Sequence, residues 1–159
     1  MLAIEAPGAD DLDPLVDLWV ALVRSQQPHG SHLLAGPNRS SARDLLAQYV
    51  VSDDVLVARI GTDLVGFVMF HIESGFYAQD ATRGVVDNLY VDPDYREAGI
   101  GSRLLAEAED ALADEGASVV ALSAMATNDA ARRLYREAGY DLHRVELEKE
   151  IESDTHSRE

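Results

Sequence analysis

The chain has 159 residues, 29 of them acidic and 13 basic, and its formal net charge is −16. This excess of negative charge disfavours a nucleic-acid partner, because binding to phosphates needs clustered lysine and arginine. The absence of cysteine excludes disulfides, thiolate metal sites and a cysteine nucleophile.

The first half of the chain predicts one strand, two helices and a hairpin. The long helix has its apolar residues on one face and acidic residues in its first turns, and the hairpin is two apolar runs around a glycine-containing turn. In chain order, we expect a strand at residues 2–6, a helix at 9–26, a loop at 27–41, a second helix at 41–52, and the two hairpin strands at 54–60 and 64–74.

The second half alternates strands and helices. Glycines punctuate it: Gly116 is expected to end one helix and Gly139 the next. We expect a loop at residues 75–84, a strand at 85–91, a helix at 100–115, a strand at 117–126, a helix at 127–139 and a last strand at 140–151. Together these elements predict a mixed α/β sheet with helices on its faces, in a single domain of residues 1–151, followed by a polar tail at 152–159.

Two glycines, Gly99 and Gly101, stand where the helix of residues 100–115 begins. The first N–H groups of a helix have no internal partner and carry partial positive charge. Glycines let a phosphate approach them, and Arg96 adds a fixed positive charge. The pattern is neither a P-loop nor a dinucleotide fingerprint, because it has no G-K-[ST] and no third glycine. A plain strand–helix turn and a nucleotide-binding α/β domain remain alternatives.

Two motifs together resemble the GNAT superfamily of acetyl-CoA-dependent N-acetyltransferases. Residues 96–101, Arg-Glu-Ala-Gly-Ile-Gly, match its R/Q-x-x-G-x-G/A loop for acyl-CoA. About thirty residues later, Asn128, Ala131 and Tyr135 match its N-x-x-A-x-x-x-Y helix. The resemblance covers nearly the whole chain and implies a mixed, mostly antiparallel sheet of six to seven strands with about four helices.

The resemblance also implies the residues that bind acetyl-CoA as co-substrate. Backbone groups of the strand 85–91 would bond the pantetheine arm, and the glycine loop would hold the pyrophosphate. The implied cofactor-binding residues are Leu89, Val91, Arg96, Ala98, Gly99, Ile100, Gly101, Ser102, Asn128 and Ala131. Tyr135 matches the family position that protonates the leaving sulfur; its alternative role is to anchor the helix to the core. Asn128 can cap its helix, touch the cofactor, or both.

The expected reaction is direct transfer of an acetyl group to a primary amine of a small molecule or peptide. Asp87 is the candidate base, predicted to share a strand face with Leu89, and Glu73 and His71 are the other candidates. The acceptor pocket is expected to involve the second predicted helix and the loops 29–39 and 75–83, the latter with Phe76 and Tyr77 as walls. The rival interpretation is a module that binds acyl-CoA without turnover.

The chain carries no sign of secretion or of membrane insertion. No apolar run reaches the roughly 18 residues that cross a bilayer, and no signal peptide opens the sequence. We therefore expect a cytoplasmic protein with no membrane partner. No metal site is expected, because the five histidines lack ligand spacing. The acidity and the single lysine resemble proteins of salt-loving microbes, with an ordinary acidic enzyme as the alternative, and a homodimer stays open.

Overall fold

A five-stranded sheet organises the computed structural model, which describes residues 1–96 and 98–152. Glu97 of the glycine-loop motif and the predicted tail from residue 153 onward lie outside the described residues. The strands are neighbours in chain order: β1 (Leu2–Glu5), β2 (Val55–Ile60), β3 (Asp63–Ile72), β4 (Arg83–Val91) and β5 (Val119–Leu122). The first three pairings are antiparallel, and β4 pairs with β5 in parallel.

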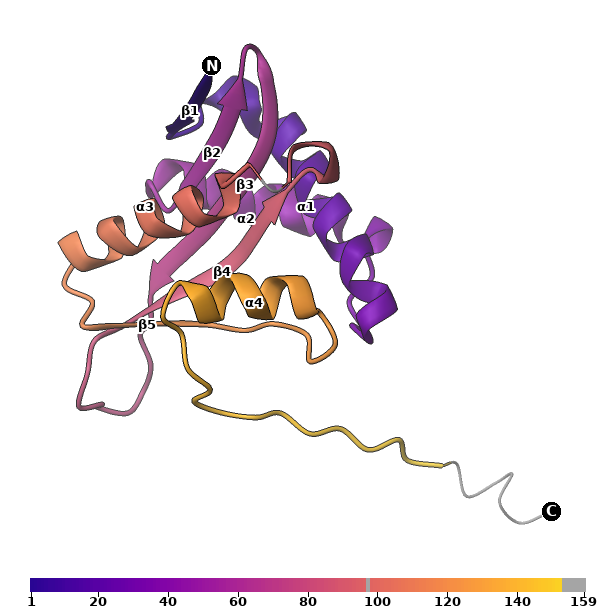
Figure 1. Ribbon diagram of the computed structural model, residues 1–159, viewed down its shortest axis with the longest axis vertical. Helices are drawn as coiled ribbons and strands as arrows, with labels where there is room; N and C mark the ends of the chain where they lie inside the picture. Colours follow the sequence, from indigo (N-terminus) through magenta and orange to yellow (C-terminus); the bar gives the residue numbers. More distant parts are fainter. Residues whose placement is uncertain (97, 153–159) are drawn as a thin grey trace.

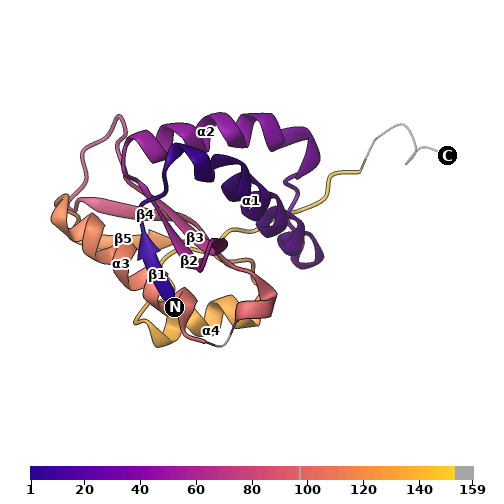
Figure 2. The same ribbon diagram turned by 90° about the horizontal axis from the view of Figure 1, so that it is seen from above.

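Helices cover both faces of this sheet (Figures 1 and 2). The helices are α1 (Leu12–Gln26), α2 (Arg39–Val51), α3 (Ile100–Asp114) and α4 (Asp129–Glu137). Figure 2 shows α1 and α2 on one side of the strands and α3 and α4 on the other. The predicted helices and loops are confirmed to within a few residues, because their apolar periodicity matches the faces that they bury.

The core consists of two apolar clusters, one on each face of the sheet. Leu15 and Leu46 of α1 and α2 are fully buried against Phe67 and Met69 of β3. On the other face, Leu104 and Leu112 of α3 pack with Val68 and Phe70 of the same strand. Alternate residues of β3 thus point to opposite clusters, as the two-residue period of a strand requires.

The sheet has fewer strands than the six to seven predicted. Residues 140–151, predicted as the last strand, form neither helix nor strand, and residues 141–151 are exposed. The alternation of Leu142, Val145 and Leu147 is that of a strand, but a strand exists only where another strand pairs with it. Figure 1 shows this segment leaving α4 and extending away from the body of the molecule.

In the described part of the chain, no helix combines the length and the apolarity that a membrane crossing requires.

Candidate functional site

The pairing between β4 and β5 ends halfway along β4. Their parallel pairing runs from Arg83 opposite Val119 to Val86 opposite Leu122, and there β5 ends. β4 continues to Val91 beside β3, without β5 on its other edge. The second half of β4 is therefore an open strand edge inside the fold.

Backbone groups of Leu89 and Val91 are directed to that open edge. The Asp92 N–H donates to the Val65 carbonyl of β3, so the alternate residues Val91 and Leu89 turn their N–H and C=O groups the other way. The Val91 carbonyl accepts from Nε of Arg96 at 2.9 Å, and the Arg96 guanidinium lies 5.4 Å from the centre of the Tyr90 ring. Arg96 is thus held beside the end of β4.

The start of α3 lies next to this edge. Gly99, the N-cap residue, has φ +79°, a left-handed conformation that favours glycine, and no side chain of the described residues caps the helix there. The first turn contains no acidic residue. The N–H groups of Ile100, Gly101 and Ser102 are therefore available to an anion.

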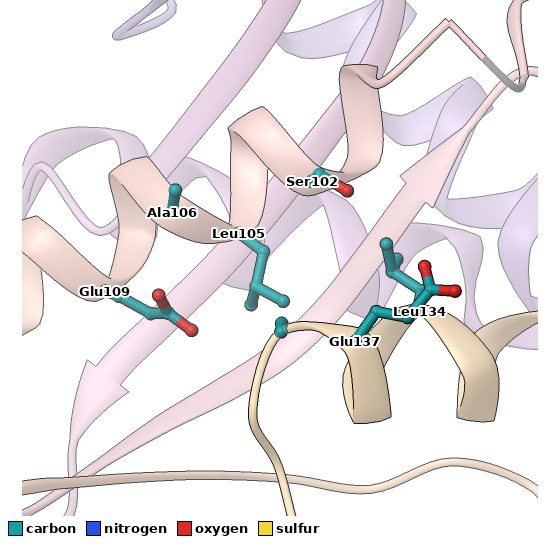
Figure 3. Close-up of a pocket in the computed structure, with 7 residues that line it drawn as sticks. Ser102, Leu105, Ala106, Glu109, Leu134 and Glu137 are labelled. Atoms are coloured by element: carbon teal, nitrogen blue, oxygen red, sulfur yellow. The ribbon is translucent and has the colours of Figure 1, made fainter.

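β4, α3 and α4 meet at Gly101. A Cβ atom built on Gly101 would lie 3.5 Å from Cδ2 of Leu134 and 3.7 Å from Cγ2 of Val91. From there a groove of about 290 Å³ runs between α3 and α4. Figure 3 shows Ser102, Leu105 and Glu109 of α3 facing Leu134 and Glu137 of α4 across it. Glu109 and Glu137 carry negative charge and would repel a polyanion in this groove.

α4 carries the second motif on its inner side. The Asn128 side chain accepts from the Ala131 N–H at 3.1 Å and so caps the helix, as predicted for one of its two roles. Tyr135 packs against the cluster under α3, and its ring meets the Tyr140 ring edge-on at 6.1 Å between centroids. Burial raises the pKa of the Tyr135 hydroxyl, so it stays protonated at neutral pH.

Asp87, Tyr49 and His71 form a cluster of three polar side chains near the point where the β4–β5 pairing ends. Oδ2 of Asp87 accepts from the Tyr49 hydroxyl of α2 at 2.9 Å and lies 2.8 Å from Nδ1 of His71 on β3. The Tyr49 hydroxyl is 3.4 Å from the same nitrogen. Burial, followed by the neighbouring Asp87 carboxylate, raises the pKa of Tyr49, so the hydroxyl keeps its proton and donates a hydrogen bond to that carboxylate. Tyr49 could not be predicted from the sequence, because nothing in its helix pattern indicates a contact with a residue 38 positions away.

The prediction that Asp87 and Leu89 share a strand face is wrong. The β3–β4 register shifts between Met69 and Phe70, which pair with Asn88 and Val86, so Asp87 is the extra residue of a β-bulge. Leu89 packs with the cluster under α3, whereas Asp87 reaches Tyr49 of α2 on the opposite face. A bulge reverses the alternation of side chains between the two faces of a strand, and no residue in this sequence predicts the bulge.

The other candidate residues lie apart from this cluster. The Glu73 carboxylate accepts from Arg83 at 3.1 and 3.2 Å and from Gln79 at 3.1 Å, so it is engaged in an ion pair. Phe76 and Tyr77 are 102% and 87% exposed. Within residues 1–96 and 98–152, no three metal-ligating side chains gather into a possible metal site.

Comparison with known proteins finds one family along most of the chain. The model of the acetyltransferase (GNAT) family matches residues 21–140. An uncharacterized N-acetyltransferase of Archaeoglobus fulgidus is 29% identical over 145 residues, covering 91% of this chain and 95% of that protein. The mycothiol acetyltransferase of Clavibacter michiganensis subsp. michiganensis is 34% identical over 142 residues, covering 87% of this chain but only 42% of the relative.

Solved structures share the fold. A PaiA N-acetyltransferase from Thermoplasma acidophilum, solved in complex with coenzyme A, superposes with a TM-score of 0.74 over 92% of this chain and 93% of its own. Its sequence is 20% identical, so the likeness concerns the fold alone.

Proposed function

Because the chain belongs to the acetyltransferase (GNAT) family, we propose that it transfers an acetyl group from acetyl-CoA directly to a primary amine of a small molecule or peptide. One observation carries the proposal: the open edge of β4 lies beside the uncapped start of α3. An extended ligand can pair with the first, and an anion can bind the second.

The residues present fit a long ligand with a pyrophosphate. Leu89 and Val91 offer backbone groups to its extended arm, and Arg96 is held where it can share the Val91 carbonyl or turn to a phosphate. Ile100, Gly101 and Ser102 offer N–H groups, and Ala98 and Gly99 leave room because both are exposed. Asn128 and Ala131 are tied to each other at the start of α4, and we propose that this capped turn borders the ligand.

Acetyl-CoA supplies an activated thioester, and the chain supplies proton transfer around it. The amine must lose a proton and the departing sulfur must gain one. We propose Tyr135 as the proton donor, since its partly buried side chain holds its proton at neutral pH.

On the amine side we propose that Asp87 and His71 act together. With the proton on Nδ1, His71 donates to Asp87 at 2.8 Å, which leaves Nε2 as an acceptor for the proton of the amine. The Tyr49 hydroxyl donates to the same carboxylate oxygen and fixes its position. Asp87 then stabilises the tautomer of His71 that carries its proton on Nδ1, and a third group that orients the base in this way is common in acid–base sites.

A coupled assay tests the proposal. The chain is incubated with acetyl-CoA and a panel of amines, and a thiol reagent measures the coenzyme A released. The chain has no cysteine, so the protein itself adds no background. Acetylated amine and thiol release in equal amounts support direct transfer. Tight binding of acetyl-CoA with no release for any amine would instead indicate the module without turnover.

A further inference from the structure

Three apolar side chains lie on the sheet beside the proposed base. Val120 and Leu122 of β5 pack with the cluster under α3, and a Cβ atom added at Gly84 of β4 would meet Leu112 of α3. The alternate residues of both strands therefore face the side of α1 and α2. The apolar ones, which we call the apolar strip, are Val85 of β4 and Val119 and Ala121 of β5.

The register of the sheet places one end of the apolar strip next to His71. Val85 pairs with His71 of β3 on one side and with Ala121 on the other, so the three residues form one row across the sheet. The His71 ring meets the Tyr49 ring edge-on, with 6.4 Å between the two centroids. The apolar strip therefore begins at the side chain that we propose as the base.

An ion pair marks the other end of the apolar strip. Val119 pairs with Arg83 of β4, whose guanidinium donates to both oxygens of the Glu73 carboxylate. Arg83 and Val85 are two residues apart on β4, which is about 6.6 Å along a strand. The side chains of Arg83 and Glu73 are 21% and 30% exposed, so their polar groups are accessible to a ligand on the apolar strip.

The apolar strip is open to such a ligand. In the described part of the chain, neither apolar cluster of the core includes Val85, Val119 or Ala121. Val119 is 46% exposed, and the other two residues are half-buried. Binding sites for small molecules combine an apolar lining with a few polar groups that fix the orientation of the ligand. Here the lining connects a base at one end with an ion pair at the other.

We propose that the apolar strip selects the acceptor of the acetyl group, an inference that rests on the proposed function. The substrate is a primary amine on a straight, unsubstituted stem of about four or five carbons, with a hydrogen-bonding group at the far end of the stem. The amine lies at His71, the stem lies along the apolar strip, and the far group bonds to the pair of Arg83 and Glu73. A lysine side chain in a peptide and a free amino alcohol share this chemistry.

The same geometry disfavours amines on polar stems. A hydroxyl group on the stem would lie against Val85 or Ala121, whose side chains have no donor or acceptor and whose backbone groups belong to the strand pairing. A polar group that leaves water without a partner costs free energy. Amino sugars are therefore expected to be poor acceptors, whereas methylene groups gain from leaving water.

A series of amino alcohols that differ only in stem length tests the proposal. Each added methylene group is expected to raise kcat/KM about fourfold from the two-carbon to the four-carbon amine, chiefly through a lower KM for the amine. Lysine with both α-groups blocked, alone and within a peptide, is expected to be a substrate, and the faster of the two identifies a free or a peptide acceptor. A kcat/KM that is flat or falls with stem length overturns the proposal.

Ala121→Leu fills the apolar strip and is expected to abolish the dependence on stem length. The KM for the four-carbon amine should rise by about tenfold, while the KM for acetyl-CoA stays unchanged. Ala113→Leu makes the same substitution at an exposed position near the end of α3 and is expected to change neither constant. A folded Ala121→Leu protein that keeps the wild-type dependence on stem length contradicts the proposal.

Methyl NMR gives a readout that does not depend on turnover. Titration with the four-carbon amino alcohol is expected to shift the methyl signals of Val85 and Val119. The signals of Val51, which is 84% exposed at the end of α2, should stay in place. Shifts without acetyl transfer would refute the proposed function and still support the apolar strip as the amine site. If the signals of Val85 and Val119 do not move at saturating amine, the proposal is wrong, with or without acetyl transfer.

Discussion

Gly101→Ala separates the anion-binding role of the α3 start from a purely structural one. The added Cβ would meet Leu134 at 3.5 Å and Val91 at 3.7 Å, which are ordinary van der Waals contacts. It therefore fits the free protein without strain. Alanine is favoured over glycine in a helix by up to about 1 kcal/mol, so the melting temperature should stay level or rise.

Binding should change in the opposite direction. A methyl group beside the N–H groups of the first turn keeps a phosphate from its closest approach. Loss of one hydrogen bond to a charged group costs about 1.5–3 kcal/mol, which corresponds to a roughly 10- to 150-fold weaker affinity for acetyl-CoA. A variant that is as stable as the wild type but binds far more weakly is the expected result.

Calorimetric titration with acetyl-CoA and thermal unfolding measure the two effects on the same samples. Gly8→Ala is the control, because nothing lies within 4 Å of its added Cβ and its φ is −97°. It should change neither quantity appreciably. Gly99→Ala should lower stability by about 1–2 kcal/mol, since its φ of +79° is left-handed. Unchanged affinity in a folded Gly101→Ala protein would refute the placement of the pyrophosphate at this helix start.

Tyr135→Phe should lower kcat by about 100-fold in steady-state kinetics with little change in the KM for acetyl-CoA. His71→Gln should lower kcat/KM for the amine by about 100-fold in steady-state kinetics, because it removes the proposed base. Gly84→Ala should destabilise the protein by about 1–3 kcal/mol in urea unfolding, since its Cβ would lie 2.9 Å from Cδ1 of Leu112. The melting temperature should rise with KCl, because molar salt screens the repulsion among 29 acidic residues; sucrose, which does not screen charge, should not reproduce the full rise, and a flat or falling trend with KCl would contradict the salt adaptation.

Most elements could be predicted from the sequence because their signals are local. The stripe of Ile100, Leu104 and Leu112 specifies the buried face of α3, and Gly99 marks its start. The runs on either side of Gly61 predict the β2–β3 hairpin, which forms between Val55 and Ile72. In each case, residues close in the sequence determine the element.

The geometry around Asp87 could not be predicted, because it depends on a neighbouring strand and on a distant helix. The bulge arises from the register against Met69 and Phe70, and it turns Asp87 away from the face of Leu89. That turn brings the carboxylate to Tyr49 and His71. A carboxylate chosen by strand parity alone would have been placed under α3, on the wrong side of the sheet for this cluster.

The open edge of β4 explains why the proposed co-substrate site could not be read from apolar periodicity. Periodicity reports which face of a strand is buried, but it does not report which edge is paired. β4 is unpaired by β5 beyond Val86. The backbone groups of that edge can form hydrogen bonds with an extended ligand, and we propose the pantetheine arm of acetyl-CoA as that ligand. The edge lies next to the start of α3, because Gly101 and Val91 approach each other there. The same end of β4 therefore offers backbone groups to an extended arm and a helix start to an anion.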